Sequence, residues 1–220
     1  LKTIHNVLKK DKPKLLFICN PNNPTGTRLE AKDILKLSKI SSKTLIIIDE
    51  LYEAFTGDSI LPLTNFNETP NLVALRSLSK TAGLAGLRIG FAIGNPQVIE
   101  RINRVTGPYD INSFAVTASF AAIKDQEYID SYVEKILEAK NWLKTKLVKY
   151  RVKHHIEGGN YFLIWPKNTA SSIQKYLKEQ GILVRDMSKK NLIEGSLRVT
   201  IGTVSQMKTF WDAFKVADKI

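Results

Sequence analysis

Cysteine and histidine are scarce in this sequence, with one cysteine (Cys19) and three histidines among 220 residues. One cysteine excludes an intramolecular disulfide, and no Cys/His pair has the spacing of a zinc site. Long apolar runs are lacking as well, because the longest are about strand length, far below the ~20 residues that a membrane-spanning helix needs. No segment resembles a signal peptide. These absences predict a cytoplasmic protein with neither a metal site nor a membrane partner.

Acidic residues are outnumbered, since 21 Asp and Glu face 33 Lys and Arg, which gives a formal charge of +12. Such a charge raises the hypothesis of a nucleic-acid partner. The lysines, however, are scattered through helix-like segments and are not clustered with aromatic residues, as a nucleic-acid site would favour. A lysine-rich solvated surface is the better explanation, and no nucleic-acid partner is expected.

The first half of the chain alternates short aliphatic runs with helical patterns. Alternation of this kind is typical of βα units and predicts an α/β fold with a mainly parallel sheet. The expected strands are Lys14–Cys19, Leu45–Asp49, Leu72–Ser77 and Ile89–Gly94, and the expected helices are Glu30–Ile40 and Pro96–Val105. Four consecutive aliphatic residues in Leu45–Asp49 indicate a strand that is buried on both faces.

The second half has a different order of predicted elements. It begins with two helical patterns, about Phe114–Lys124 and the longer Glu127–Lys149. We expect a domain boundary at the start of the longer helix, between a large domain (1–126) and a small α+β domain (127–220). The small domain is predicted to contain strands at Val152–Ile156, Tyr161–Trp165, Ile182–Arg185 and Leu197–Ile201, and helices at Ser171–Gln180 and Gln206–Val216. Gly181 is a suitable left-handed stop for the first of these helices.

One stretch, Arg76–Gly90, concentrates polar chemistry directly after a predicted strand. Ser77, Ser79 and Arg88 provide the hydroxyl donors and the guanidinium group that bind a phosphate monoester. Lys80 lies between them, and a lysine desolvated beside other cations can be a neutral amine fit for Schiff-base chemistry. Alone, Lys80 would be read as one more surface lysine. Phosphate ligands around one reactive lysine indicate pyridoxal phosphate.

Two further stretches carry candidate residues. Asp49 ends a buried strand, where it could either bind a protonated ring nitrogen or cap the following segment. Tyr52, three residues later, could bind a ligand oxygen or simply pack. Asn23 lies in the turn-rich segment Asn20–Gly26 (NPNNPTG), where Asn before Pro is by itself an ordinary turn signal.

Taken together, the NPNNPTG, DELY and RSLSKTAGLAGLRIG blocks resemble, in order and spacing, the fold-type I pyridoxal-phosphate aminotransferases, and among them the histidinol-phosphate aminotransferases. The resemblance covers nearly the whole chain and implies a large domain of the pyridoxal-phosphate-dependent transferase fold followed by a small C-terminal domain. It implies that Lys80 forms a Schiff base with the cofactor and then acts as a general base. The implied cofactor-binding residues are Asn23, Asp49, Tyr52, Ser77, Ser79, Lys80 and Arg88, and the implied substrate-binding residues are Arg185, Arg198 and Asn23. Tyr109 and Asn112 would belong to the wall of the site.

The resemblance implies transfer of an amino group between histidinol phosphate and 2-oxoglutarate, as in histidine biosynthesis. The partners would be a small-molecule amino donor, a 2-oxo acid and a second copy of the chain in a homodimer. Two related activities stay open: an aromatic amino-acid aminotransferase and a threonine-phosphate decarboxylase.

The chain departs from the family pattern at its start, because full-length members carry a substantial segment before the NPNNPTG strand. That segment supplies phosphate-binding amides, a ring that stacks on the cofactor and a tyrosine shared across the dimer. We therefore expect these 220 residues to be the C-terminal portion of such an enzyme, with apolar surface left uncovered. A non-catalytic scaffold fragment is the alternative from another functional class.

Overall fold

The computed structural model describes residues 1–220, which fall into two separately packed units. The first unit contains residues 1–21 and 28–129, and the second contains residues 22–27 and 130–220. The predicted division at residue 126 did not foresee that the short loop 22–27 packs with the second unit. The interpretation of the two units as a cofactor-binding domain and a small C-terminal domain stays a prediction.

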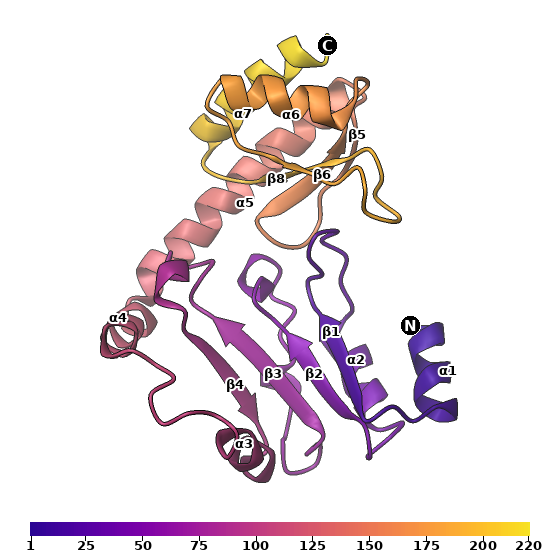
Figure 1. Ribbon diagram of the computed structural model, residues 1–220, viewed down its shortest axis with the longest axis vertical. Coiled ribbons are helices and arrows are strands. Elements are labelled where there is room, and N and C mark those ends of the chain that lie inside the picture. The colour runs from indigo at the N-terminus through magenta and orange to yellow at the C-terminus, as the bar shows by residue number, and fades with distance from the viewer. The chain divides into compact units, whose positions relative to one another are not determined.

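A four-stranded sheet in the order β1-β2-β3-β4 is the frame of the first unit (Figure 1). Its strands are β1 (Leu15–Cys19), β2 (Leu45–Asp49), β3 (Leu72–Ser77) and β4 (Gly90–Gly94). The first three are parallel, and β4 runs antiparallel to β3. The prediction of a mainly parallel sheet is confirmed. Because β1 to β3 share one direction, their carboxyl ends meet at the same edge of the sheet.

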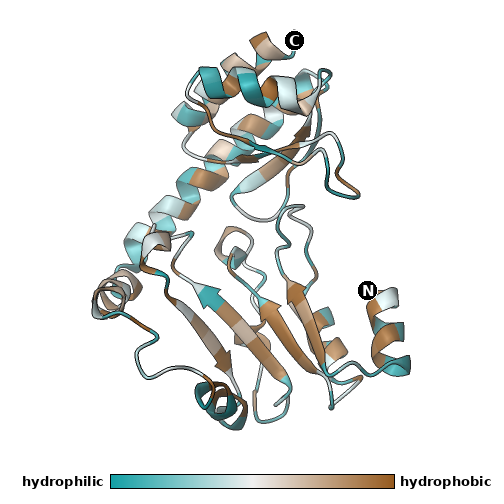
Figure 2. Ribbon diagram, in the orientation of Figure 1, coloured by the Kyte–Doolittle hydropathy of each residue, from teal (hydrophilic) through white to brown (hydrophobic).

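Helices α1 (Lys2–Lys10) and α2 (Ala31–Ser38) supply side chains to the core on one face of this sheet. The core side chains alternate along the strands, as period-2 geometry requires; they are Leu8, Ile18, Ile34, Leu37, Ile46, Ile48, Ile60, Leu72 and Ala74. Figure 2 shows the corresponding apolar colour along β1 and β2 and a polar carboxyl end of β3. On the opposite face, Leu15 and Phe17 are each 52% exposed.

Three further helices follow β4: α3 (Pro96–Asn103), α4 (Ser113–Lys124) and the long α5 (Gln126–Lys149). Asn95 and Asn112 cap α3 and α4, since each side-chain oxygen accepts a hydrogen bond from a first-turn amide. Helix α4 buries only small side chains and leaves Phe114, Phe120 and Ile123 exposed. Its apolar composition is therefore not explained by the packing of the unit.

The second unit is built on an antiparallel sheet in the order β5-β6-β8-β7. Its strands are β5 (Lys153–His155), β6 (Tyr161–Trp165), β7 (Arg185–Asp186) and β8 (Leu197–Thr200), with helices α6 (Ala170–Glu179) and α7 (Val204–Ala217). Phe162 packs edge-on against Phe210, which stacks on Phe214, so α7 covers one face of the sheet. Arg185, Arg198 and Tyr161 lie on the other face, as the strand register shows.

Most predicted elements are present with bounds shifted by no more than two residues, but one strand differs more and one helix was not predicted. The strand predicted over Ile182–Arg185 is wrong in extent, because only Arg185–Asp186 pairs with β8. Leu183 is 80% exposed and the Val184 carbonyl accepts from the Gln174 side chain, so neither joins the ladder. Helix α1 was not expected from the sequence. No helix has the length and apolarity needed to span a membrane.

Candidate active site

The carboxyl edge of the first sheet gathers most of the predicted site residues. Asp49 is the last residue of β2, and Ser77 is the last residue of β3, its parallel neighbour. The Asp49 carboxylate accepts a hydrogen bond from the Leu51 amide at 3.1 Å and makes no ion pair. The negative charge of Asp49 therefore has no cationic side chain as a partner at the sheet edge.

Lys80 and Tyr52 are brought together at this edge from different segments. The Lys80 ammonium lies 5.4 Å from the centroid of the Tyr52 ring. Tyr52 is buried, with 6% of its surface exposed, whereas Lys80 is half-buried. The ring therefore provides a fixed wall for a lysine that has no carboxylate partner, which is the setting expected for a reactive amine.

Ser77 and Ser79 form a hydroxyl pair beside Lys80. The Ser77 hydroxyl is 2.8 Å from that of Ser79 and also accepts from the Ser79 amide at 3.1 Å. Arg88 is the left-handed residue (φ +56°) that precedes β4, and its guanidinium donates to the Ala85 carbonyl at 3.0 Å. Register places Ser77 opposite Gly90, two residues after Arg88, so the loop returns the arginine toward the serines. We refer to Asp49, Tyr52, Ser77, Ser79, Lys80 and Arg88 as the sheet-edge cluster.

A buried ionic network supports the sheet-edge cluster, and the sequence patterns did not predict it. The Glu50 side chain is fully buried and accepts from Arg76 Nε at 2.9 Å and from the Ile60 amide at 2.7 Å. Arg76 also pairs with Glu53 and donates to the Ser59 hydroxyl at 2.8 Å. Because Glu50 follows Asp49 and Arg76 precedes Ser77, the ion pair links the ends of the two strands that carry these residues.

Cys19 is a neighbour of Asp49, which the sequence patterns did not predict. It pairs in register with Asp49 across β1 and β2, and its thiol donates to Asp49 Oδ2 at 3.7 Å. Burial raises the pKa of the Cys19 thiol above its ordinary value, and the negative charge and hydrogen bond of Asp49 add to the increase. The signal was available, because both residues end predicted neighbouring parallel strands.

A cavity of about 620 Å³ lies next to the cluster in the first unit. Its polar lining comes mainly from the ionic network and Ser77, and its apolar lining includes Phe91, Ile93 and Ile123. Asp49, Tyr52 and Lys80 are not part of its wall. The cavity therefore does not define the reactive edge, which we place by the chemistry of its side chains.

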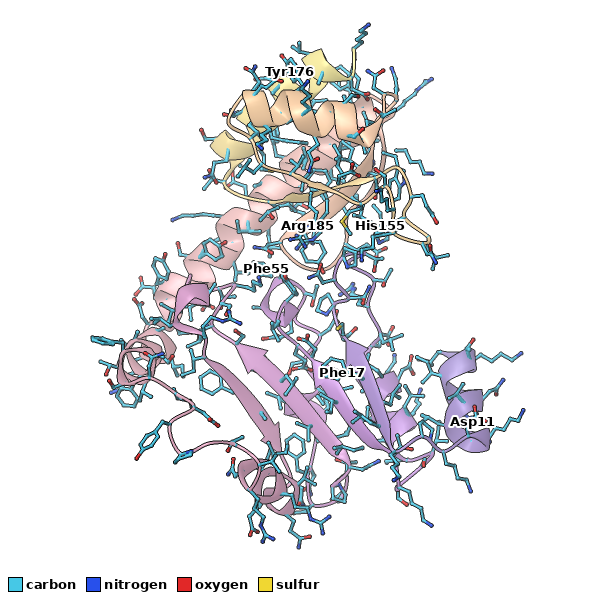
Figure 3. The ribbon with its side chains drawn as sticks, in the orientation of Figure 1. Asp11, Phe17, Phe55, His155, Tyr176 and Arg185 are labelled. Atoms are coloured by element: carbon cyan, nitrogen blue, oxygen red, sulfur yellow. The ribbon has the colours of Figure 1, made fainter.

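In the second unit, Arg185 and Arg198 are direct partners across β7 and β8. Like charges in directly opposite positions of a sheet repel each other, so the pair favours an anion between or near the two guanidinium groups. Arg198 lies with its Cζ 4.2 Å from the centroid of the Tyr161 ring, and its Nε is buried without a hydrogen-bond partner. Arg185 is exposed (Figure 3).

The loop 22–27, which contains most of the NPNNPTG segment, packs within the same unit. The Tyr161 hydroxyl donates to the Asn22 carbonyl at 2.6 Å, and the Gly158 amide donates to the Gly26 carbonyl at 2.9 Å. Gly26 has φ +80°, and a Cβ at this position would meet the Gly158 carbonyl oxygen at 2.9 Å, so only glycine fits. Asn23 itself is exposed on this loop.

The structure places the remaining predicted residues less tightly. Tyr109 is 94% exposed, while Asn112 caps α4 and its amide donates to the Leu87 carbonyl at 3.2 Å, next to Arg88. No group of three His, Cys, Asp or Glu side chains is arranged to hold a metal ion. The nearest acidic group recorded for His155 is Glu157, whose Oε2 lies 3.9 Å from His155 Nε2.

Comparison with known proteins identifies the family. The family model described as aminotransferase class I and II matches residues 1–214. The chain belongs to this aminotransferase family. Histidinol-phosphate aminotransferase of Thermoanaerobacter sp. (strain X514) is 39% identical over 198 residues, which are 90% of this chain and 55% of that protein. The chain thus spans about half the length of the curated relatives that it matches.

Solved structures show the same similarity. Histidinol-phosphate aminotransferase from Clostridium acetobutylicum superposes with a TM-score of 0.87 at 25% identity, covering 99% of this chain and 68% of that one. L-threonine-O-3-phosphate decarboxylase from Porphyromonas gingivalis superposes with a TM-score of 0.82 at 28% identity, covering 92% and 64%. The fold predicted from the sequence is therefore confirmed as that of this family.

The family uses pyridoxal phosphate, and the sheet-edge cluster fits such a group chemically. Asp49 makes no ion pair, so its carboxylate is available to a protonated ring nitrogen, and Lys80 offers an amine without a carboxylate partner. The Ser77–Ser79 hydroxyls and the exposed Arg88 guanidinium are suitable donors to a phosphate. In this chain, the side chains gathered on one sheet edge are suited to the ring nitrogen, the aldehyde and the phosphate of the cofactor.

Proposed function

We propose that this chain carries the cofactor-binding and substrate-binding residues of a histidinol-phosphate aminotransferase. Such an enzyme transfers an amino group between histidinol phosphate and 2-oxoglutarate in histidine biosynthesis. The observation that carries the proposal is the approach of Lys80 to the Tyr52 ring at 5.4 Å, on the edge where Asp49 ends β2. The 39% identity to a protein of that name supports the choice of substrate.

The sheet-edge cluster would hold pyridoxal phosphate through complementary charges. Asp49 would accept a hydrogen bond from the ring nitrogen and keep it protonated, while Ser77, Ser79 and Arg88 would donate to the phosphate. Tyr52 and Asn23 would donate to the phenolic oxygen. When bound, the cofactor supplies an electron sink for the electron pair left at the substrate's α-carbon.

Lys80 has two roles in this proposal: its Nζ first anchors the cofactor covalently, and, once released by the substrate amine, it takes up and returns a proton. The half-buried position against Tyr52 supports this assignment, because a wall of ring atoms restricts the lysine and excludes water on one side. Neither role would survive replacement by alanine.

Arg185 and Arg198 would bind the distal anionic group of each substrate. One half-reaction brings a phosphate and the other a carboxylate, and guanidinium groups bind both through paired hydrogen bonds. The cross-strand placement of the two arginines supports this assignment, since an anion relieves the repulsion between them. The partners are thus a small-molecule amino donor and a 2-oxo acid.

We also propose that two copies of the chain associate as a homodimer. Phe114, Phe120 and Ile123 on α4 are 81%, 63% and 55% exposed, an arrangement that favours burial against another surface. Sedimentation analysis of the chain tests this; a monomer at all concentrations would reject it. The cytoplasmic location stays a prediction.

Borohydride trapping tests the proposed site directly. The chain is mixed with pyridoxal phosphate, reduced and digested, and the modified lysine is located by mass. We expect specific labelling of Lys80, none at that position in Lys80→Ala, and unchanged labelling in Lys149→Ala, which removes an exposed lysine. Labelling spread over many lysines, or no labelling, would favour the non-catalytic scaffold.

Substrate assays then separate the related activities. The 28% identity to a threonine-phosphate decarboxylase favours that reaction as the second candidate. Turnover of histidinol phosphate with 2-oxoglutarate should exceed that of phenylalanine, and threonine phosphate should release no carbon dioxide. Release of carbon dioxide from threonine phosphate would move the assignment to the decarboxylase.

A further inference from the structure

Tyr161 occupies a position that none of the roles above explains. It is 1% exposed on β6, and its ring lies one diagonal step from Arg198 in the register of β6 and β8. The guanidinium carbon lies 4.2 Å above the ring centroid, well inside the range of a cation–π contact. Arg198 Nε is buried without a hydrogen-bond partner, so no hydrogen bond at that nitrogen fixes the guanidinium group, and the ring contact can orient it.

The hydroxyl of the same side chain reaches a distant part of the chain. It donates to the Asn22 carbonyl at 2.6 Å, across 139 residues of sequence. Asn22 precedes Asn23 in a tight loop that is closed by hydrogen bonds from the Asn22 amide to Thr27 (2.8 Å) and from the Gly26 amide to Asn22 (2.7 Å). Tyr161 therefore contacts the loop through the carbonyl next to the predicted cofactor-binding asparagine.

The backbone of the second unit leaves Tyr161 little freedom. Gly159 has φ +80°, and a Cβ there would lie 2.5 Å from the tyrosine Cε1 atom. The Gly158 amide meanwhile binds the Gly26 carbonyl at 2.9 Å. The ring thus lies against a glycine, and the segment that leads into its strand is hydrogen-bonded to the same loop that its hydroxyl contacts.

We propose that Tyr161 is a positioning residue that couples the loop 22–27 to Arg198. Its hydroxyl holds the loop that presents Asn23, and its ring orients the arginine for an anionic ligand. The assignment rests on the proposed function for the roles of Asn23 and Arg198. The coupling itself belongs to the fold of the second unit and is measurable without cofactor or turnover.

Two substitutions separate the two contacts. Tyr161→Phe keeps the ring and removes the hydroxyl, whereas Tyr161→Leu removes both. Tyr176→Phe, in α6, is the matched control that removes a hydroxyl elsewhere in the unit. Hydrogen–deuterium exchange of the full chain reports the loop amides of residues 22–27, and calorimetry with inorganic phosphate reports the anion site, with Arg198→Gln defining the part that depends on this arginine.

We expect loop exchange to become about fivefold to tenfold faster in both Tyr161 variants, which corresponds to the loss of one hydrogen bond, while α7 amides and Tyr176→Phe stay unchanged. Arg198-dependent phosphate binding should persist in Tyr161→Phe and weaken about threefold to tenfold in Tyr161→Leu. Unchanged loop exchange in Tyr161→Phe, or equal losses of phosphate binding in the two variants, would overturn the coupling.

A different result would reject the proposed function. If Arg198→Gln binds phosphate as the unaltered chain does, the substrate role of this arginine is rejected. Faster loop exchange in Tyr161→Phe with unchanged α7 exchange would still establish the tether between β6 and the loop. Uniformly faster exchange in both segments would instead identify Tyr161 as an ordinary core residue and reject its positioning role.

Discussion

Glu50 and Arg76 form a buried ion pair, 2.9 Å between Oε2 and Nε, that joins the residue after Asp49 to the residue before Ser77. The Glu50 side chain has no exposed surface and that of Arg76 is 25% exposed. A carboxylate in such a position depends on its partner, because an unpaired buried charge is strongly destabilising. The pair therefore matters less for its own attraction than for the geometry it imposes on two strand ends.

Removal of the arginine should be costly. We expect Arg76→Met to lower the free energy of unfolding by about 3–5 kcal/mol, since Glu50 is left buried without its cation. Arg104→Ala, which breaks an exposed pair with Glu100, should change it by no more than about 0.5 kcal/mol. Urea unfolding measures both.

A double variant checks the reason for that loss. Glu50→Gln combined with Arg76→Met removes the charge on both sides, so it should be more stable than Arg76→Met alone. A double variant that is less stable than Arg76→Met would mean that the glutamate is not the source of the penalty.

The sequence predicted the sheet well because its strands are runs of aliphatic residues bounded by turn residues. Leu45–Asp49 has the same limits in the structure as in the prediction. The parallel order of β1 and β2 also followed from the pattern, and with it the nearness of Cys19 to Asp49 could have been stated. The sheet-edge residues come from segments that follow neighbouring strands, so their meeting was implied by the topology.

Contacts that join distant segments could not be predicted from the sequence. The hydrogen bond from Tyr161 to Asn22 spans 139 residues, and no local pattern of aromatic or turn residues specifies such a partner. The short β7 was overestimated for a related reason, because pairing with β8, and not the apolar run Ile182–Val184, decides which residues are strand. The β-propensity of a segment does not specify which strand it will pair with.

The sole cysteine provides a reporter for Asp49. Asp49→Asn removes the charge, which is the second contribution to the raised pKa of the Cys19 thiol, and leaves burial, which is the largest. We therefore expect the pKa to fall part of the way toward its ordinary value. At pH 8 more of the thiol would be ionised, so alkylation by iodoacetamide should be faster in Asp49→Asn than in the unaltered chain.

The same shift has a consequence for stability, with a definite sign. A thiol pKa that is higher in the folded state contributes stability below the unfolded pKa of about 8.5 and loses it as the pH rises through the folded pKa. The unaltered chain should thus lose more stability above pH 8.5 than Cys19→Ser does. Parallel pH profiles of the two proteins would contradict the raised pKa.

Arg185 should lower the stability of the free chain and, at the same time, favour anion binding. Arg185→Gln removes the repulsion of directly opposite like charges, so we expect the free energy of unfolding to rise by roughly 0.2–1 kcal/mol at low salt. The gain should shrink at 1 M salt because the charges are screened. Stabilisation by added phosphate should be smaller than in the unaltered chain, as thermal unfolding with and without phosphate will measure.

Lys175→Gln is a control for the change in net charge, because it removes an exposed cation of α6 and leaves both arginines in place. It should alter neither the salt dependence nor the response to phosphate. Equal effects of the two substitutions would show that the overall positive charge, and not the cross-strand pair, governs anion binding.

A comparison of Gly159 with Gly181 separates the steric effect of the Tyr161 ring from the effect of backbone strain. Both have left-handed backbones, with φ of +80° and +76°, so alanine costs about 1–2 kcal/mol at either position. Nothing lies within 4 Å of a Cβ at Gly181, whereas a Cβ at Gly159 would overlap the Tyr161 ring at 2.5 Å. Overpacking of this kind adds about 1–3 kcal/mol. Gly159→Ala should therefore lower the free energy of unfolding by about 2–5 kcal/mol, and Gly181→Ala by about 1–2 kcal/mol.

The combination Gly159→Ala with Tyr161→Leu decides whether the ring is the cause. Removing the ring removes the overlap, so the alanine should cost less in the Tyr161→Leu background than in the unaltered chain, with a coupling of at least about 0.5 kcal/mol. The same combination with Gly181→Ala should be additive, because Gly181 has no contact with the ring. Additivity at Gly159 would mean that the new methyl group is accommodated by movement of the Gly158–Gly159 backbone, and Tyr161 would then not be held by that glycine.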